Sequence, residues 1–91
     1  MDKNNSDNLD SFRQEIAKID DEIILLLIER FKLTHKLGLI KKNNNLPVLN
    51  KEVEDTILTR LVNNSHGDID SRFILKIYTE IFEESKRRQS E

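Results

Sequence analysis

Apolar residues recur at alternating spacings of three and four along the first part of this 91-residue chain. The series is Leu9, Phe12, Ile16, Ile19, Ile23, Leu26, Leu33, Leu37 and Ile40, with Arg30 where one further apolar residue is due. A heptad stripe sustained this long predicts a single helix from about residue 9 to residue 42. At 1.5 Å per residue that helix is roughly 50 Å long, whereas a compact chain of this size is only about 30 Å across. The chain cannot cover such a helix by itself.

The middle of the predicted helix is apolar on its remaining faces as well. The residues there are Ile24, Leu25, Leu27, Ile28 and Phe31. A helix that is apolar nearly all round must be buried nearly all round. The simplest solution is a homodimer in which two long helices pack against each other, with shorter helices wrapped around them.

The rest of the chain also favours helices, because it holds only two glycines and one proline. Residues 1–8 are polar and are expected to be disordered, so that the domain comprises residues 9–91. A connection with three asparagines and Pro47 leads to Asn50, which is placed to cap a second helix from Lys51 to about Asn63. After a loop, Asp68 or Asp70 is expected to cap a third helix that runs to about residue 89. The prediction is an all-α fold of one long and two shorter helices.

Composition excludes several classes of function. The absence of cysteine rules out a disulfide framework, a thiolate metal site and a cysteine nucleophile. A net charge of -2 with interspersed charges offers no broad field for nucleic acid, and the basic run Lys86 to Arg88 is better explained as cations at the carboxyl end of a helix. No apolar run approaches the roughly 20 residues that span a bilayer, and the polar start lacks a secretion signal. We therefore expect a cytoplasmic protein without nucleic-acid or membrane partners. His35 and His66 are expected to be solvent-exposed rather than catalytic.

Polar residues at core positions are the informative ones, because a buried charge is costly unless it is paired. Arg30 and Lys41 are eleven residues apart, which places them on one side of the helix at a separation of about 16 Å. Arg13 is rotated by roughly 100° from Arg30 and lies about 25 Å along the axis. It cannot share a small ligand with Arg30 inside one chain, but in an antiparallel dimer it could enter the other chain's site.

The two shorter helices also carry polar groups on apolar faces. Glu54 opens the second helix on its inner side, and Ser85 and Gln89 extend the apolar stripe of the third. Together with the cations of the long helix they could line a pocket for an anion. Each residue also has a purely structural interpretation.

Those structural interpretations differ from residue to residue. Arg30 could pair with a glutamate across a dimer and set its register. Arg13 could be a surface residue, and Lys41 could extend its charged end to solvent near the helix end. Glu54 could be a first-turn acid favoured by the helix dipole, whereas Ser85 and Gln89 could belong to a frayed terminus. Gly38 either allows a close backbone approach or is a tolerated weak point.

This arrangement resembles the all-helical chorismate mutase family. The similarity covers nearly the whole chain, from "LDSFRQEIAKIDDEIILLLIERFKL" through "GLIKK" and "LPVLNKEVEDTIL" to "EESKRRQ". Its opening pattern is L-x-x-x-R-x-x-I-x-x-I-D-x-x-I, followed by E-R and by G-x-x-K. The resemblance implies intertwined homodimers of three-helix chains whose long first helices pair antiparallel. It also implies conversion of chorismate to prephenate by an intramolecular Claisen rearrangement, without a metal or cofactor.

The resemblance further implies a role for each matching residue. Arg30 would bind one substrate carboxylate and Arg13 of the partner subunit the other. Lys41 and Gln89 would donate to the ether oxygen, and Lys41 also to a carboxylate. The remaining roles fall to two residues of the shorter helices: Glu54 would accept from the ring hydroxyl, and Ser85 would assist near a carboxylate.

Two positions depart from the commonest pattern of this family. Asn50 stands where an aspartate is frequent, which preserves hydrogen bonding at the substrate and removes a charge. Val53 stands where many members carry a further arginine. These departures favour one alternative that stays open, a non-catalytic helical dimer that regulates or binds a partner. A second alternative is an isochorismate pyruvate-lyase, which has the same fold and similar cationic residues.

Overall fold

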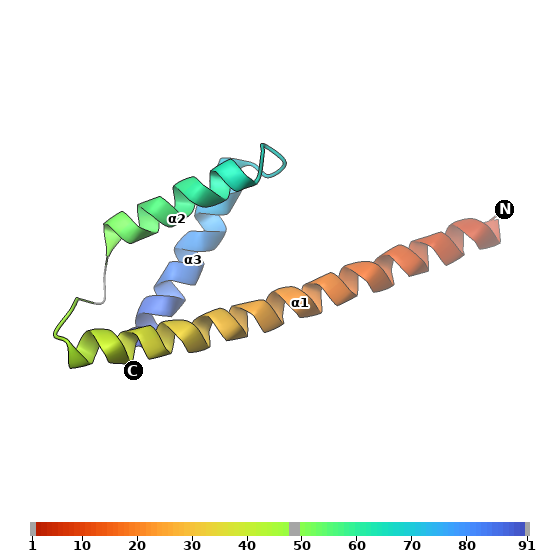
Figure 1. The fold of residues 1–91 in the computed structure, drawn as a ribbon. Coiled ribbons are helices and arrows are strands. Elements are labelled where there is room, and N and C mark those ends of the chain that lie inside the picture. Colours follow the sequence, from red (N-terminus) through yellow and green to blue (C-terminus); the bar gives the residue numbers. More distant parts are fainter. Residues whose placement is uncertain (1, 48–49, 91) are drawn as a thin grey trace. The chain divides into compact units, whose positions relative to one another are not determined.

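A computed structural model describes residues 2–47 and 50–90 of the chain. It contains three α-helices: α1 from Asp2–Asn43, α2 from Lys51–Asn64 and α3 from Ser71–Ser90 (Figure 1). No strand occurs within those described ranges. The predicted all-α class, with one long helix followed by two shorter ones, is confirmed. None of the described helices combines the length and the apolar character needed to cross a membrane.

The start of the long helix differs from the prediction. Helix α1 begins at Asp2 rather than near residue 9. The predicted start was wrong because it followed the apolar pattern, whereas the polar residues before Leu9 include neither glycine nor proline to stop a helix. The division of the chain into a terminal segment 1–8 and a domain 9–91 stays a prediction.

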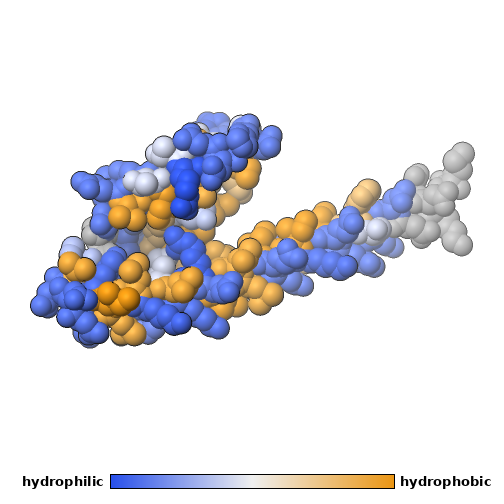
Figure 2. Space-filling view, in the orientation of Figure 1, coloured by the Kyte–Doolittle hydropathy of each residue, from blue (hydrophilic) through white to orange (hydrophobic). Residues whose placement is uncertain are grey.

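The chain divides into two compact units, Met1–Arg30 and Phe31–Glu91. The first unit is helix alone, and its apolar stripe is exposed. Figure 2 shows apolar side chains along one side of α1. The exposed members in this unit are Leu9, Phe12, Ile16, Ile19, Ile23 and Leu26, each with about half or more of its surface accessible. The described residues of a single chain therefore leave this stripe uncovered.

The second unit contains the last turns of α1 together with α2 and α3. Its most buried apolar residues are Ile74, Ile81 and Phe82, all on α3. The Tyr78 ring packs edge-on against Phe82, with the ring centroids 5.7 Å apart, an arrangement that aromatic quadrupoles favour. Among the described side chains the buried core is thus small and is centred on α3.

Helix α1 ends because Asn45 adopts a left-handed conformation, with φ of 56°. The Leu46 N–H donates to the Lys41 carbonyl at 2.7 Å, and the Asn45 N–H donates to the Lys42 carbonyl at 3.3 Å. This is the Schellman pattern, in which asparagine replaces the more usual glycine. The predicted connection continues through residues 48 and 49, which lie outside the described residues. The motif closes α1 just beyond Lys41.

Both shorter helices begin at polar caps. The Asn50 side-chain oxygen accepts from the Val53 N–H at 3.2 Å, and the Asp70 carboxylate accepts from the Arg72 N–H at 2.8 Å. Each bond satisfies a backbone donor that has no partner inside its helix. Capping by Asn50 was predicted and is confirmed. Asp70, rather than Asp68, makes the cap of α3.

Candidate active site

Two of the sequence-predicted site residues meet across the second unit. Lys41 lies in the last turn of α1 and Gln89 in the last turn of α3. The Lys41 ammonium donates to the Gln89 side-chain oxygen, Oε1, over 3.1 Å. Because an ammonium can only donate, this bond requires the amide oxygen to face Lys41 and leaves the amide NH₂ group as a donor. The pair therefore offers N–H donors from two helices at one place.

Gly38 allows this meeting. It is buried, and a Cβ atom at its position would lie 2.7 Å from the Gln89 Cα and 2.8 Å from the Gln89 carbonyl oxygen. These neighbours are backbone atoms, which cannot turn aside as the end of a flexible side chain can. Of the two interpretations of Gly38, the close backbone approach is confirmed. Its missing side chain is what allows the end of α3 to reach α1.

We expect Gly38→Ala to lower the free energy of unfolding by about 1 kcal/mol. Overpacking typically costs about 1–3 kcal/mol, and alanine returns about 1 kcal/mol as the better helix former. Urea unfolding measures the change, and the NMR signal of the Gln89 side-chain amide should shift as Gln89 is displaced. Lys36→Ala is the control, because Lys36 is an exposed residue of the same helix. An unaltered Gln89 signal in Gly38→Ala would show that the close approach is not maintained in solution.

Two further residues of α1 contact the end of α3. The His35 ring donates from Nδ1 to the Arg88 carbonyl over 3.1 Å, and Nδ1 must carry the hydrogen because a carbonyl only accepts. The Arg88 guanidinium lies 4.8 Å from the centroid of the Phe31 ring, within the range of a cation–π interaction. His35 is exposed, as predicted. Its observed role is to hold the residue next to Gln89.

Glu54 forms an ion pair that links α2 to α3. The Lys86 ammonium lies 3.2 Å from the Glu54 carboxylate, and about a quarter of each side chain is exposed. Glu54 is half-buried, in line with its predicted inward direction. Lys86 was interpreted from sequence only as one of the cations at a helix end. The spacing Lys86–Gln89, three residues on one helix, was the signal that could have placed it near the predicted site.

The other two cations of the basic run pair within α3. Arg87 and Arg88 both donate to Glu84, one turn earlier. These hydrogen bonds, first from Arg87 and then from Arg88, hold the pKa of the Glu84 carboxyl below its usual value. They lie in the last turn of the helix, where cations are favoured by the dipole. For Arg87 and Arg88 the helix-end interpretation is therefore consistent with the structure.

Ser85 and Asn50 already have partners in this chain. Ser85 is buried, and its hydroxyl donates to the Ile81 carbonyl over 2.8 Å. Helix α3 continues to Ser90, so that Ser85 does not lie in a frayed terminus. The Asn50 side-chain oxygen caps α2 by accepting from the Val53 N–H. Both residues have evident structural roles.

Arg13 and Arg30 belong to the first unit. Arg13 is exposed and Arg30 is half-buried. Lys41 and Glu54 belong to the second unit, and the positions of the two arginines relative to them stay predictions.

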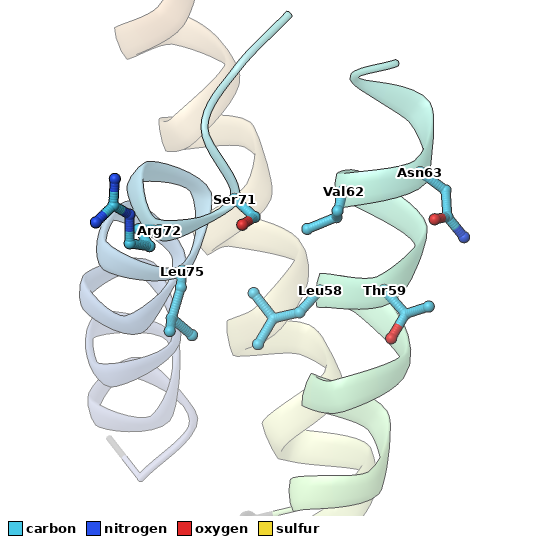
Figure 3. A pocket seen from close by; sticks show the side chains of 7 residues that line it. All are labelled: Leu58, Thr59, Val62, Asn63, Ser71, Arg72 and Leu75. Carbon is cyan, nitrogen blue, oxygen red and sulfur yellow. The ribbon is translucent and has the colours of Figure 1, made fainter. Parts of the chain in front are cut away.

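A shallow pocket of about 360 Å³ between α2 and α3 holds none of the predicted site residues. Figure 3 shows Leu58 and Val62 of α2 facing Leu75 of α3, with Arg72 turned away. Apolar walls of this kind do not suit a charged ligand. Within the described residues, no three histidine, aspartate or glutamate side chains gather as metal ligands do. The polar groups around Lys41, Gln89, Lys86 and Glu54 are the better candidate for an anion site.

Known proteins resemble this chain over most of its length. The family model of chorismate mutase type II matches residues 12–90. A bifunctional chorismate mutase/prephenate dehydratase from Buchnera aphidicola subsp. Schizaphis graminum is 36% identical over 76 residues, which is 82% of this chain and 20% of that protein. A protein of the same description from Aquifex aeolicus is 38% identical over 79 residues, 82% of this chain and 22% of its own length.

The chain thus spans about a fifth of the length of the curated relatives it matches. No solved structure matches it significantly. The family match nevertheless includes all of α2 and α3 and most of α1, and with them all the predicted site residues. The chain therefore belongs to the chorismate mutase type II family.

Proposed function

We propose that this chain is a chorismate mutase, an isomerase that converts chorismate to prephenate on the route to phenylalanine and tyrosine. The observation that carries the proposal is the Lys41–Gln89 hydrogen bond of 3.1 Å, found in a chain whose family match includes both residues. The proposal covers the mutase reaction alone, because the matched part is only about a fifth of the bifunctional relatives.

The reaction suits the residues that the chain offers. An intramolecular Claisen rearrangement transfers no proton and uses no nucleophile. The protein must hold a flexible dianion in a compact, chair-like conformer and stabilise the charge that builds on the ether oxygen as the C–O bond breaks. Arginines grip planar carboxylates in a bidentate manner, which supplies the first requirement. Fixed N–H donors aimed at the ether oxygen supply the second.

Lys41 and Gln89 are the proposed donors to the ether oxygen. Lys41 has three ammonium hydrogens, of which one is used by Gln89. The same bond orients the Gln89 amide so that its NH₂ group is available to an acceptor. Since each donor holds the other, little rearrangement is needed when negative charge develops. Such preorganisation is usually the largest single contribution to catalysis.

The other proposed contacts orient the substrate. Glu54 accepts from the ring hydroxyl, with its second oxygen near Lys86. Ser85 assists at a carboxylate, for which its hydroxyl must turn away from the Ile81 carbonyl that it now contacts. Asn50 contributes its amide NH₂ group while its oxygen caps α2.

We also propose that two chains form an intertwined dimer with antiparallel α1 helices. The exposed apolar stripe from Leu9 to Leu26 supports this, because soluble monomers rarely leave so long an apolar surface open. In the dimer Arg30 binds one substrate carboxylate, and Arg13 of the partner subunit binds the other. The site then needs two chains.

The deciding experiment offers the purified protein chorismate and, separately, isochorismate. Prephenate from chorismate is the expected product. Salicylate and pyruvate from isochorismate, without prephenate from chorismate, would instead identify a pyruvate-lyase. No turnover of either substrate, combined with no thermal stabilisation by a transition-state analogue of the mutase reaction, would favour a non-catalytic dimer. Sedimentation equilibrium tests the dimer independently.

A further inference from the structure

Lys86 makes an ion pair between α2 and α3. Its ammonium lies 3.2 Å from the Glu54 carboxylate on α2 and 3.6 Å from the Glu83 carboxylate on its own helix. The Glu83 side chain is 67% exposed, whereas Glu54 is 23% and Lys86 26% exposed. An ion pair is screened less when it is partly buried, so the contact with Glu54 is the stronger of the two.

Lys86 is also a neighbour of Gln89 on the surface of α3, because residues three apart on a helix lie on the same face. It precedes Gln89 by three residues, which on a helix means a rotation of about 60° and an advance of about 4.5 Å. Polar groups therefore form a row across three helices. Glu54 of α2 pairs with Lys86 of α3, Gln89 follows Lys86 by one turn of α3, and Gln89 accepts from Lys41 of α1. Lys86 stands between the carboxylate at one end of the row and the N–H donors at the other.

The charges along this row favour a cation at the position of Lys86. A substrate dianion that approaches Lys41 and Gln89 also approaches the Glu54 carboxylate, and like charges repel strongly where solvent is partly excluded. An ammonium between the two anions attracts both. Because Lys86 keeps about a quarter of its side chain exposed, a ligand can reach it without breaking the contact with Glu54. A lysine ammonium has three hydrogens and can serve two acceptors at once.

We propose that Lys86 is a further substrate-binding residue, whose ammonium contacts a carboxylate of the anionic substrate while it holds Glu54 in place. This inference rests on the proposed mutase function. Within the second unit it adds a further cation, besides Lys41, to the residues that contact the substrate. It also assigns Lys86 a role different from that of Arg87 and Arg88, which pair with Glu84.

A purely structural role for Lys86 makes a different prediction. If the ion pair only ties α2 to α3, its removal lowers thermal stability and leaves the KM for chorismate unchanged. If Lys86 contacts the substrate, removal of its charge raises KM even where the fold is intact. The KM therefore separates the two roles, and a second replacement that keeps the charge provides the rescue.

The experiment compares Lys86→Gln, Lys86→Arg and Arg87→Gln with the unaltered chain in a steady-state prephenate assay. We expect Lys86→Gln to raise KM about tenfold, in line with the loss of a hydrogen bond between charged groups, with a smaller change in kcat. Lys86→Arg should restore KM to within about threefold, because it retains a donor with positive charge. Arg87→Gln is the matched control on the same helix and should leave KM unchanged.

Two results would overturn the inference. One is a KM in Lys86→Gln within about twofold of the unaltered chain. The other is an equal rise in KM in Arg87→Gln, which would point to a general effect of net charge. Absence of turnover in the unaltered chain contradicts the proposed function instead, so that the two failures are distinguishable.

Discussion

Replacement of Lys41 by alanine should lower kcat for prephenate formation about 10²- to 10³-fold, the usual loss when one fixed donor to a developing charge is removed. The Lys41 ammonium also donates to Gln89, so the change removes one donor and loosens the other. Alanine is a good helix former, and the Lys41 backbone carbonyl can still accept from Leu46 at the end of α1. The expected loss is therefore one of rate rather than of fold, measured by steady-state kinetics and circular dichroism.

Lys42→Ala is the matched control for this prediction. Lys42 follows Lys41 in the same last turn of α1, has the same charge and is exposed. A fall in kcat confined to Lys41→Ala excludes a general effect of charge at the helix end. Near-full turnover in Lys41→Ala would show that Lys41 is not a donor to the ether oxygen.

The helices could be predicted from sequence because local chemistry determines them. The heptad stripe indicates α1, the three asparagines mark its end, and Asn50 and Asp70 supply the caps of the next two helices. The start of α1 could not be located in this way, because polar residues without a helix breaker carry no periodic signal. The apolar pattern indicates which turns must be buried, whereas a helix can continue beyond them.

The meeting of Lys41 with Gln89 could be predicted only in part. Helical phase places each residue on the apolar face of its own helix, but it does not say how two helices approach. Here the close approach depends on Gly38, which has no side chain. The periodicity of the sequence cannot tell whether such a glycine allows a close approach or only weakens the helix. Lys86 was missed because it stands in a run with Arg87 and Arg88, whose contacts with Glu84 are those of an ordinary helix end.

Arg13 and Arg30 show a different limit. Their directions on α1 follow from helix geometry, and geometry also separates them by about 25 Å within one chain. A site that uses both needs a second chain, and the contacts of one chain cannot supply it. The assignment of Arg13 to the partner's site therefore depends on an experiment that mixes chains.

Mixing an Arg13→Ala chain with a Lys41→Ala chain should restore activity that neither variant has alone. In the proposed dimer, the site built on the Arg13→Ala chain keeps its own Lys41 and receives an intact Arg13 from the other chain. Random reassortment of equal amounts produces heterodimers as about half of all dimers, each with one intact site. Activity per chain should therefore recover to about a quarter of the unaltered protein after joint unfolding and refolding.

The control for this experiment mixes Lys41→Ala with Gln89→Ala. These two residues are hydrogen-bonded within one chain, so each chain in such a heterodimer carries a defective site of its own. No recovery is expected, which separates true complementation from a general benefit of mixing. Failure of the Arg13→Ala and Lys41→Ala mixture to recover, with heterodimers verified by mass spectrometry, would place Arg13 outside the partner's site. Recovery in that mixture alone would establish that each site takes Lys41 and Gln89 from one chain and Arg13 from the other.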